Sequence, residues 1–362
     1  MSHLLYLIRP AEGGMRGHLQ SLLNYFSAGM KLHLAAPEDT QLDIPSTAGT
    51  RINLPLGTGL NPAHDLRSFW RFYRILREIR PALLHIHGFK AALIGAPAAR
   101  LAGTPLVITV HNYPADLTGQ RFIPHLSILP GLRKARYIAV SHALARELTG
   151  WGVNPSLITV IHNGIEPAPF EKAAALRCAG RVGSGAVVGT VARLVSQKGL
   201  DYFLQAAVRL AVRYPKMRFL VAGDGPERDK LRNLARRLGL GEKMHFAGYS
   251  SQIATHLAAM DIFVLPSLTE GLATSLLEAQ AAGCAVVAAR VGGVPEVVED
   301  GRTGLLVPPA DGAALAAAVV SLVENPLLAV RLARAGQENV KMQFSLQAML
   351  GRTAAVYEEI IR

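Results

Sequence analysis

Short, almost continuously apolar segments alternate with longer amphipathic ones, and this alternation limits the possible folds more than any other feature of the chain. Residues 4–8, 106–110 and 262–265 are apolar runs of strand length, and each is followed by a polar or glycine-containing loop. Strands that are apolar at nearly every position are typical of parallel sheets covered by helices on both faces. The sequence therefore predicts an α/β fold built on parallel sheets.

The alternation occurs twice, and 362 residues exceed what a single hydrophobic core usually supports. Residues 1–165 are predicted to form one Rossmann-like domain and residues 186–343 a second one. Residues 166–185 contain two prolines and several small residues, and they are predicted to be a linker. The expected helices include residues 18–26, 67–79, 200–214 and 275–282. Ligands of open parallel sheets bind beyond the carboxyl ends of the strands, so the expected site is the cleft between the two domains.

Composition and charge limit the location and the partners. The apolar run 91–99 lies between Lys90 and Arg100 and is too short to span a membrane, while Cys178 and Cys284 have no metal or redox spacing. These features favour a cytoplasmic protein. Its net charge of +12 favours anionic partners such as sugar nucleotides or phospholipid headgroups, and the absence of nucleic-acid-binding motifs disfavours nucleic acid.

Most of the excess positive charge lies in the first domain, where residues 1–165 hold 16 Lys and Arg against 8 Asp and Glu, a net +8. Helical spacing places Arg67, Arg71, Arg74 and Arg77 on one face of the helix 67–79 together with Trp70. A solvated outer face is the favoured interpretation. A peripheral contact with an anionic membrane, at its inner face, is the alternative.

A candidate anion site lies between the strand 262–265 and the helix 275–282. Glu270 is in the loop and Glu278 is one turn inside the helix. The peptide N–H groups of residues 274–277 fall in the first turn, where four donors have no intrahelical partner and the helix dipole favours an anion. Ser275 and Glu278 also have the spacing of a capping box, and this structural interpretation is favoured from the pattern alone.

Four other loops at strand ends carry polar or glycine-rich sequences. Residues 12–18, which include Gly14, permit close backbone approach to a ligand, and His111 directly follows the strand 106–110. Arg193 and Lys198 are two cations before a helix and can neutralise a diphosphate, whereas residues 223–226 can be simple helix punctuation. Each loop has an ordinary structural alternative. The chain has no D-x-D pair, so an aspartate-bound divalent metal is not predicted.

Taken together, these motifs and their order resemble a known family. The motifs are Gly13-Gly14 with His18, residues 107–112, residues 160–165, residues 189–193 with Lys198-Gly199, residues 221–226, residues 270–278 and residues 292–296. This set resembles the retaining family 4 glycosyltransferases of the GT-B fold, and the resemblance spans nearly the whole chain. It implies two Rossmann-like domains facing a central cleft, with residues 344–362 crossing back as a helix onto the first domain.

The resemblance also implies roles for single residues. In the second domain, Arg193 and Lys198 would contact the diphosphate of a sugar nucleotide, assisted by the first-turn amides of Thr274, Ser275 and Leu276. Glu278 would bind the ribose hydroxyls and Glu270 would contact the donor sugar.

In the first domain, which would hold the acceptor, Gly14 would close over the phosphates and His111 would lie near the donor sugar. The residues expected to take part in the chemistry are Glu270, His111, Arg193 and Lys198. No metal and no cofactor are expected.

The predicted function is transfer of a hexose-type sugar, with retention of configuration, from a UDP- or GDP-linked donor to a hydroxyl acceptor. The acceptor is expected to belong to cell-envelope glycan, glycolipid or small-molecule glycoside synthesis, and it can be lipid-linked. Alternatives are an inverting or epimerising relative and a non-catalytic sugar-nucleotide-binding partner of a membrane complex. A Rossmann oxidoreductase is least favoured, because the G-x-G-x-x-G spacing is missing.

Overall fold

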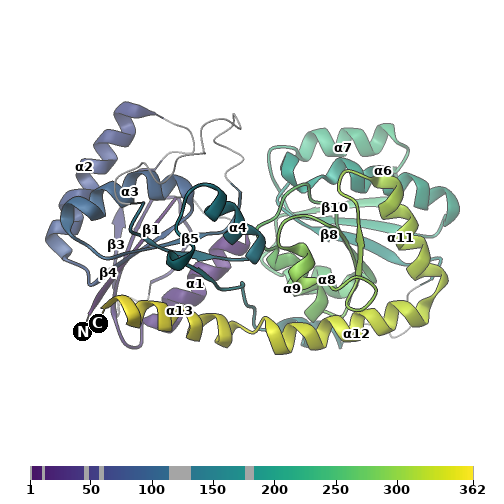
Figure 1. The fold of residues 1–362 in the computed structure, drawn as a ribbon. Helices are drawn as coiled ribbons and strands as arrows, with labels where there is room; N and C mark the ends of the chain where they lie inside the picture. Colours follow the sequence, from purple (N-terminus) through teal and green to yellow (C-terminus); the bar gives the residue numbers. More distant parts are fainter. Residues whose placement is uncertain are drawn as a thin grey trace. The chain divides into compact units, whose positions relative to one another are not determined.

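The computed structural model describes residues 2–9, 13–44, 49–56, 61–113, 132–175 and 183–361 (Figure 1). The chain divides into two compact units. Unit 1 consists of Met1–Asn163 and Leu346–Arg362, and unit 2 consists of Gly164–Ser345. Each unit contains a parallel sheet with helices packed on it, so the predicted α/β fold with two Rossmann-like domains is confirmed.

The described strands of unit 1 form a seven-stranded sheet in the order β3-β2-β1-β4-β5-β6-β7. The strands are β1 (His3–Ile8), β2 (Lys31–Ala36), β3 (Gly49–Asn53), β4 (Leu83–His87), β5 (Leu106–Val110), β6 (Arg136–Ala139) and β7 (Ile158–Val160). The chain winds outward in one direction from β1 and in the other direction from β4. The switch point between β1 and β4 is therefore the place where a doubly wound sheet offers a binding crevice.

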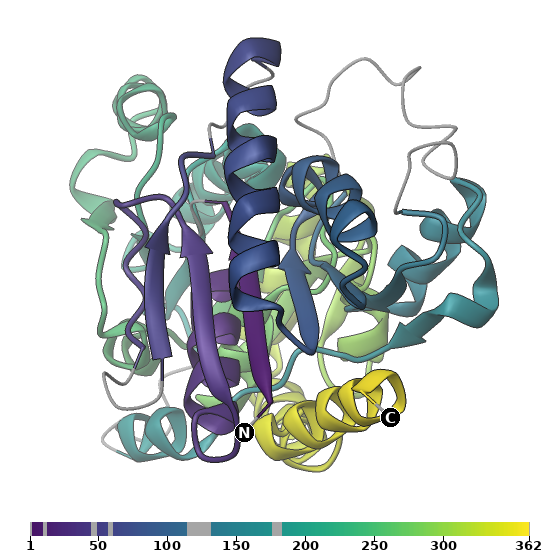
Figure 2. The same ribbon diagram turned by 90° about the vertical axis from the view of Figure 1, so that its left-hand side faces the viewer.

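Helices cover both faces of this sheet (Figures 1 and 2). They are α1 (Gly14–Phe26), α2 (Pro62–Ile79), α3 (Phe89–Ala102), α4 (His142–Gly150) and α13 (Leu346–Ile361). Leu4, Tyr6 and Ile8 of β1 share a core with residues of α1 and α13. Leu7 points the other way, and a Cβ atom added to Gly95 of α3 would lie 2.4 Å from it. This alternation along β1 explains why the strand is apolar at every position.

Unit 2 repeats the topology, with the described strand order β10-β9-β8-β11-β12-β13. The strands are β8 (Val187–Val191), β9 (Arg218–Ala222), β10 (Met244–Gly248), β11 (Ile262–Leu265), β12 (Ala285–Ala289) and β13 (Leu305–Val307). The helices are α5 (Ala168–Ala174), α6 (Leu200–Arg213), α7 (Arg228–Arg237), α8 (Ile253–Ala259), α9 (Thr274–Ala281), α10 (Val294–Val297), α11 (Gly312–Glu324) and α12 (Pro326–Gln343). Its switch point lies between β8 and β11.

The core of unit 2 places apolar residues of α6, α7 and α11 against one face of the sheet. Val188 of β8 belongs to this core, whereas a Cβ atom on the next residue, Gly189, would collide with the Met260 side chain. Met260 follows α8 directly, so α8 lies on the opposite face. α12 packs against α9 and β12. Both faces of the sheet are therefore covered, as the apolar strands predict.

The predicted linker at residues 166–185 is partly wrong. Within the described part of this segment, Ala168–Ala174 forms helix α5, which packs against α8 and α9 of unit 2. The prolines that suggested a linker stand at the start of this helix, where the missing N–H group needs no helical partner. Cys178 lies outside the described residues.

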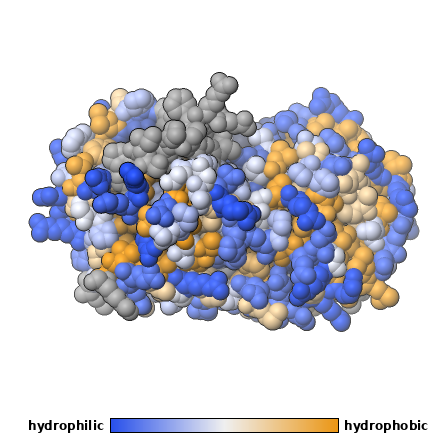
Figure 3. Space-filling view, viewed as in Figure 1, coloured by the Kyte–Doolittle hydropathy of each residue, from blue (hydrophilic) through white to orange (hydrophobic). Residues whose placement is uncertain are grey.

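Helix α2 starts earlier than predicted and has the predicted amphipathic character. Asn61 caps it by accepting a hydrogen bond from the His64 N–H group, so the helix includes one turn before residue 67. Phe72 and Leu76 are buried, whereas Trp70 is 51% exposed. Figure 3 shows hydrophilic and hydrophobic residues side by side at its left-hand edge, where Figure 1 places α2 and β3.

None of the described helices is, by itself, both long and apolar enough to cross a membrane. α11 and α12 meet the length and composition criteria only as a pair, and they are bent by 104° where they join.

Candidate functional site

The switch point of unit 2 brings together two of the predicted site residues. β8 pairs with β11, so the loops that follow these strands are neighbours. Lys198 ends a short 3-10 turn in the first loop, and its Nζ atom lies 2.6 Å from Oε1 of Glu270 in the second. The Ser267 hydroxyl donates a hydrogen bond of 2.7 Å to the same oxygen. Glu270 is only 3% exposed and Lys198 is 25% exposed, so the carboxylate is fixed from two sides.

The two loops approach so closely that a side chain is excluded between them. Gly199 has a φ of +61°, and a Cβ atom there would lie 2.2 Å from the carbonyl oxygen of Pro266. The Leu268 N–H group donates to the Gln197 carbonyl at 2.8 Å. Backbone contacts on both sides of Lys198 therefore set the position from which its ammonium group reaches Glu270.

A third loop supports the segment that carries Arg193. Gly223 follows β9 with a φ of +135°, and a Cβ atom there would lie 1.9 Å from the Ala192 carbonyl oxygen. The Leu194 N–H group donates to the Asp224 carbonyl, and the Leu194 carbonyl accepts from the Glu227 N–H group. The 223–226 motif is thus more than helix punctuation, because it holds the loop on which the exposed Arg193 stands.

The N-terminus of α9 decides between the two interpretations of the 270–278 stretch. The helix begins at Thr274, with Ala273 at the cap position and no side-chain capping hydrogen bond. Ser275 lies inside the first turn, so the capping-box interpretation is wrong. The Leu276 N–H group donates to the Ala273 carbonyl, and the N–H groups of Thr274 and Ser275 precede the helical hydrogen-bond ladder. The predicted amides thus lie at a helix end with a positive partial charge.

Glu278 lies in the second turn of α9 and is half-buried. Burial raises its pKa from 4.5 to about 7. A raised carboxyl pKa means that folding favours the proton-bound form. The contribution of Glu278 to stability is therefore full below pH 4.5 and is lost as the pH rises toward 7. A ligand that donates hydrogen bonds to the carboxylate would pull this pKa back down.

A fourth strand-end segment touches Glu270 through the backbone. The Gly293 N–H group donates to the Glu270 carbonyl at 3.3 Å, just before helix α10 begins at Val294. The 292–296 motif therefore contacts the loop of Glu270, a contact that the sequence did not predict.

The switch point of unit 1 holds a cluster of histidines. His111 follows β5, as predicted, His87 ends β4, and His18 lies on α1, the helix that Gly14 begins. The distance from His87 Nδ1 to His111 Nε2 is 3.1 Å, and the ring centroids of His18 and His111 are 4.8 Å apart. The sequence indicates His18 only as part of a motif, and it does not predict His87 as a site residue. The available signal was the alternation of His85 and His87 in an otherwise apolar strand.

Burial keeps these imidazoles neutral at pH 7. It lowers the pKa of His18 to about 4, and it lowers the pKa of His87 and His111 well below 6.5, with repulsion between the rings as a further cause. His111 is therefore a neutral hydrogen-bonding group rather than a cation in the unliganded protein.

The C-terminal helix helps to hold this cluster. Nδ1 of His85 is hydrogen-bonded to the Tyr357 hydroxyl of α13, and its Nε2 lies 2.7 Å from the Thr109 hydroxyl. The Tyr357 hydroxyl also donates to that of Tyr6 at 3.4 Å. The rings of His85 and His87 are 4.0 Å apart, so α13 fixes the layer on which His87 packs. The predicted helix at residues 344–362 thus packs within unit 1.

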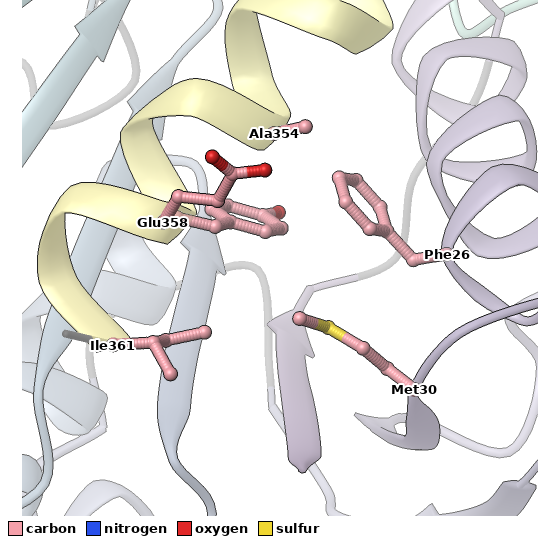
Figure 4. Close-up of a pocket in the computed structure, with 6 residues that line it drawn as sticks. Phe26, Met30, Ala354, Glu358 and Ile361 are labelled. Carbon is pink, nitrogen blue, oxygen red and sulfur yellow. The ribbon is translucent and has the colours of Figure 1, made fainter. Parts of the chain in front are cut away.

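An apolar cavity of about 350 Å³ also lies in unit 1, between α1 and α13 (Figure 4). Phe26 and Met30 line it from one side, and Ala354, Glu358 and Ile361 line it from the other. Among the described residues, its lining includes none of the predicted site residues, and Tyr357 and Glu358 are the polar side chains. It is distinct from the two switch points.

The two halves of the chain match two families of protein sequences. Residues 12–168 match "Glycosyltransferase Family 4" and residues 179–339 match "Glycosyl transferases group 1". A 2-deoxystreptamine glucosyltransferase of Streptomyces kanamyceticus is 30% identical over 327 residues, which cover 84% of each chain. A glycogen synthase of Mycobacterium tuberculosis is 31% identical over 298 residues, which cover 78% of this chain and 69% of that protein.

Solved structures show the same fold. The Anabaena protein HepE, in complex with UDP and glucose, superimposes with a TM-score of 0.83 at 23% identity, over 99% of this chain and 100% of that one. Sucrose-phosphate synthase from Thermosynechococcus elongatus has a TM-score of 0.81 at 21% identity, over 99% of both chains. With the sequence matches to both halves, these similarities establish that the chain belongs to the family 4 glycosyltransferases of the GT-B fold.

Proposed function

We propose that the protein is a retaining, metal-independent glycosyltransferase that moves a hexose-type sugar from a nucleotide diphosphate to a hydroxyl acceptor. The observation that carries this proposal is the pair of Lys198 and Glu270 at the switch point of unit 2. Sugar transfer develops negative charge on the leaving diphosphate and positive charge on the sugar. A cation at this edge of the sheet can stabilise the first, and a buried carboxylate can stabilise the second.

The leaving diphosphate gains negative charge as the bond to the sugar breaks. The ammonium group of Lys198 has three N–H donors. One of them donates to Glu270, so two remain for phosphate oxygens. Arg193 and the first-turn amides of α9 add further donors. Preorganised positive charge of this kind stabilises a departing anion in place of a metal.

The sugar gains positive charge at the same time. Glu270 is assigned to the donor sugar, where a fixed carboxylate can hold a hydroxyl group and stabilise an oxocarbenium-like state. The family resemblance assigns His111 to the donor sugar and Gly14 to the phosphates. Retention of configuration would follow from attack on the front face of the sugar, assisted by the leaving phosphate.

The donor is proposed to be a UDP- or GDP-linked sugar, with its ribose hydroxyls on Glu278. UDP is favoured by one observation, since structures of the structurally similar HepE contain UDP or UDP-glucose.

Nucleotide-sugar affinity should depend on pH through Glu278. Ribose hydroxyls donate to the carboxylate form, so a free-protein pKa of about 7 predicts a Kd that rises roughly tenfold per pH unit below pH 6. Calorimetric titration of an intact nucleotide sugar between pH 5 and 8 measures this slope. The Glu278→Gln variant is the control and should lack this part of the dependence. Equal slopes for both proteins would remove Glu278 from the ribose.

The acceptor is proposed to be a hydroxyl compound of cell-envelope glycan, glycolipid or small-molecule glycoside synthesis. Two similar proteins illustrate the range. One is the 2-deoxystreptamine glucosyltransferase, and the other is an Escherichia coli galactosyltransferase for a diphosphoundecaprenol-linked sugar, 28% identical over 281 residues. We place the reaction in the cytoplasm, with a peripheral contact to the inner face of the membrane.

Helix α2 provides the proposed membrane contact. Its arginines at positions 67, 71, 74 and 77 are exposed, and Leu66 and Trp70 stand exposed among them at 58% and 51%. Co-sedimentation with anionic vesicles should be strong at low salt and should fall at high salt. Replacing Arg71 and Arg74 by Ala should weaken it several-fold, whereas replacing Arg236 and Arg237 of α7 in unit 2 should change it little. This proposal is contradicted if the protein does not bind vesicles at low salt, or if replacing Arg71 and Arg74 leaves vesicle binding unchanged.

The configuration of the product tests the proposed reaction. With an α-linked nucleotide sugar and an accepted hydroxyl compound, proton NMR of the first product should show an α-linkage. A β-linkage would establish an inverting enzyme. Nucleotide binding without any release of free nucleotide, across a panel of acceptors, would instead support a non-catalytic binding partner.

A further inference from the structure

His18, His87 and His111 have the arrangement of three metal ligands. They come from α1, the end of β4 and the residue after β5, and one ring nitrogen of each lies within 4.8 Å of those of the other two. The side chains of His87 and His111 are 0% and 6% exposed, and that of His18 is 8% exposed. Three separate elements of unit 1 thus converge on one buried point.

Two ring nitrogens in this cluster have no partner among the described residues. They are Nδ1 of His18 and Nε2 of His87, and both are buried. A buried polar atom without a partner is unfavourable, because it has lost its hydrogen bonds to water without replacement. Two such atoms beside a third imidazole indicate a site that is completed by a bound group.

We propose that these three histidines form a binding site for a borderline transition-metal ion, with Zn²⁺ as its best fit. Neutral imidazoles bind Zn²⁺, Cu²⁺ and Ni²⁺, and three of them with one solvent position make an open tetrahedral set. Nδ1 of His87 and Nε2 of His111 are 3.1 Å apart, so these two rings lie close enough to share one ion. Mg²⁺ and Ca²⁺ fit poorly, because they prefer oxygen ligands and the three-residue group contains none.

The ion is expected to inhibit sugar transfer. This consequence rests on the proposed function, which assigns His111 to the donor sugar. A ring nitrogen that binds a metal is no longer available to a sugar hydroxyl. The site therefore makes a metal-independent transferase sensitive to Zn²⁺.

Metal binding is tested on the untagged full-length chain without donor or acceptor. After removal of metal by chelator, titration with Co²⁺ should give the visible absorption of a tetrahedral complex, and Zn²⁺ should displace it. His18→Gln and His111→Gln should each weaken Zn²⁺ binding at least tenfold, whereas His245→Gln, at an exposed position in unit 2, should leave it unchanged. Circular dichroism verifies that the variants fold; the wholly buried His87 is left intact for this reason.

The proposal is overturned if no saturable Zn²⁺ or Co²⁺ site is found, or if His18→Gln and His111→Gln bind Zn²⁺ with the affinity of the wild-type protein. A Zn²⁺ site that depends on both residues supports it, whether or not the protein transfers sugar. In an active preparation, Zn²⁺ should lower the rate and excess chelator should restore it, and a rate that is unchanged with the site saturated contradicts the inhibitory role.

Discussion

Lys198→Ala and Glu270→Ala are each expected to lower kcat by about 10²–10³-fold, because each removes a preorganised charge from the site of transfer. Lys198 Nζ and Glu270 Oε1 are 2.6 Å apart, so the loss of one also releases the other. Steady-state release of free nucleotide measures the effect. The double variant should lose little more than either single variant, since the two side chains act as one unit.

Both variants must be shown to be folded before their rates are compared. Removing Lys198 leaves a carboxylate that is 3% exposed and keeps the hydrogen bond from the Ser267 hydroxyl, so some loss of stability accompanies the loss of rate. Lys230→Ala is the matched control, because Lys230 also forms ion pairs in unit 2 but is 55% exposed. It should retain kcat within about twofold, as expected for surface pairs. Near-wild-type rates in folded Lys198→Ala or Glu270→Ala would remove these residues from the mechanism.

Gly199→Ala is expected to give the largest loss of stability and of nucleotide binding together. The new methyl group would lie 2.2 Å from the Pro266 carbonyl oxygen, and the φ of +61° is itself unfavourable for alanine. Relief requires the two loops of the site to separate. We expect a loss of at least about 3 kcal/mol, which lowers the melting temperature of unit 2 by roughly 6–12 °C.

Gly239→Ala separates the steric effect from the backbone effect. Gly239 has a similar φ of +72°, but a Cβ atom there would meet nothing within 4 Å. The Gly239→Ala variant should lose about 1 kcal/mol of stability, which lowers the melting temperature by roughly 2–4 °C, and its nucleotide affinity should be unchanged. Calorimetric melting and nucleotide titration of both variants provide the comparison. Equal melting-temperature shifts in the two variants would show that the close contact between the loops of Lys198 and Glu270 adds nothing to stability.

The fold could be predicted closely because its strands are apolar on both faces. β5 and β11 have the predicted bounds, since a continuous apolar run bounded by turns leaves few alternatives. β3 was missed because it is an edge strand whose residues are half-buried or exposed. Helix α5 was missed because Pro167 and Pro169 were interpreted as linker residues rather than as residues at the start of a helix.

The site could be predicted only in part. Strand-to-helix loops identified Lys198 and Glu270 separately, but only the strand order puts β8 beside β11 and hence these two side chains in contact. His87 was missed for the same reason, because its partner His111 is 24 residues away in sequence and one strand away in space. Ser275 was wrongly favoured as the helix cap. The capping-box pattern of Ser275 and Glu278 also occurs inside a helix, and here the helix already starts at Thr274.

A thermal-shift comparison of UDP-, GDP- and ADP-sugars on the wild-type protein and on Lys198→Ala tests the central claim most directly. Ligand binding stabilises the folded protein by mass action, by about 2.7 kcal/mol at a concentration of 100 times Kd. One nucleotide class should raise the melting temperature of the wild-type protein, and Lys198→Ala should lose most of that increase. No shift with any nucleotide sugar, or the same shift in both proteins, would contradict the assignment of a sugar-nucleotide site to the Lys198–Glu270 pair.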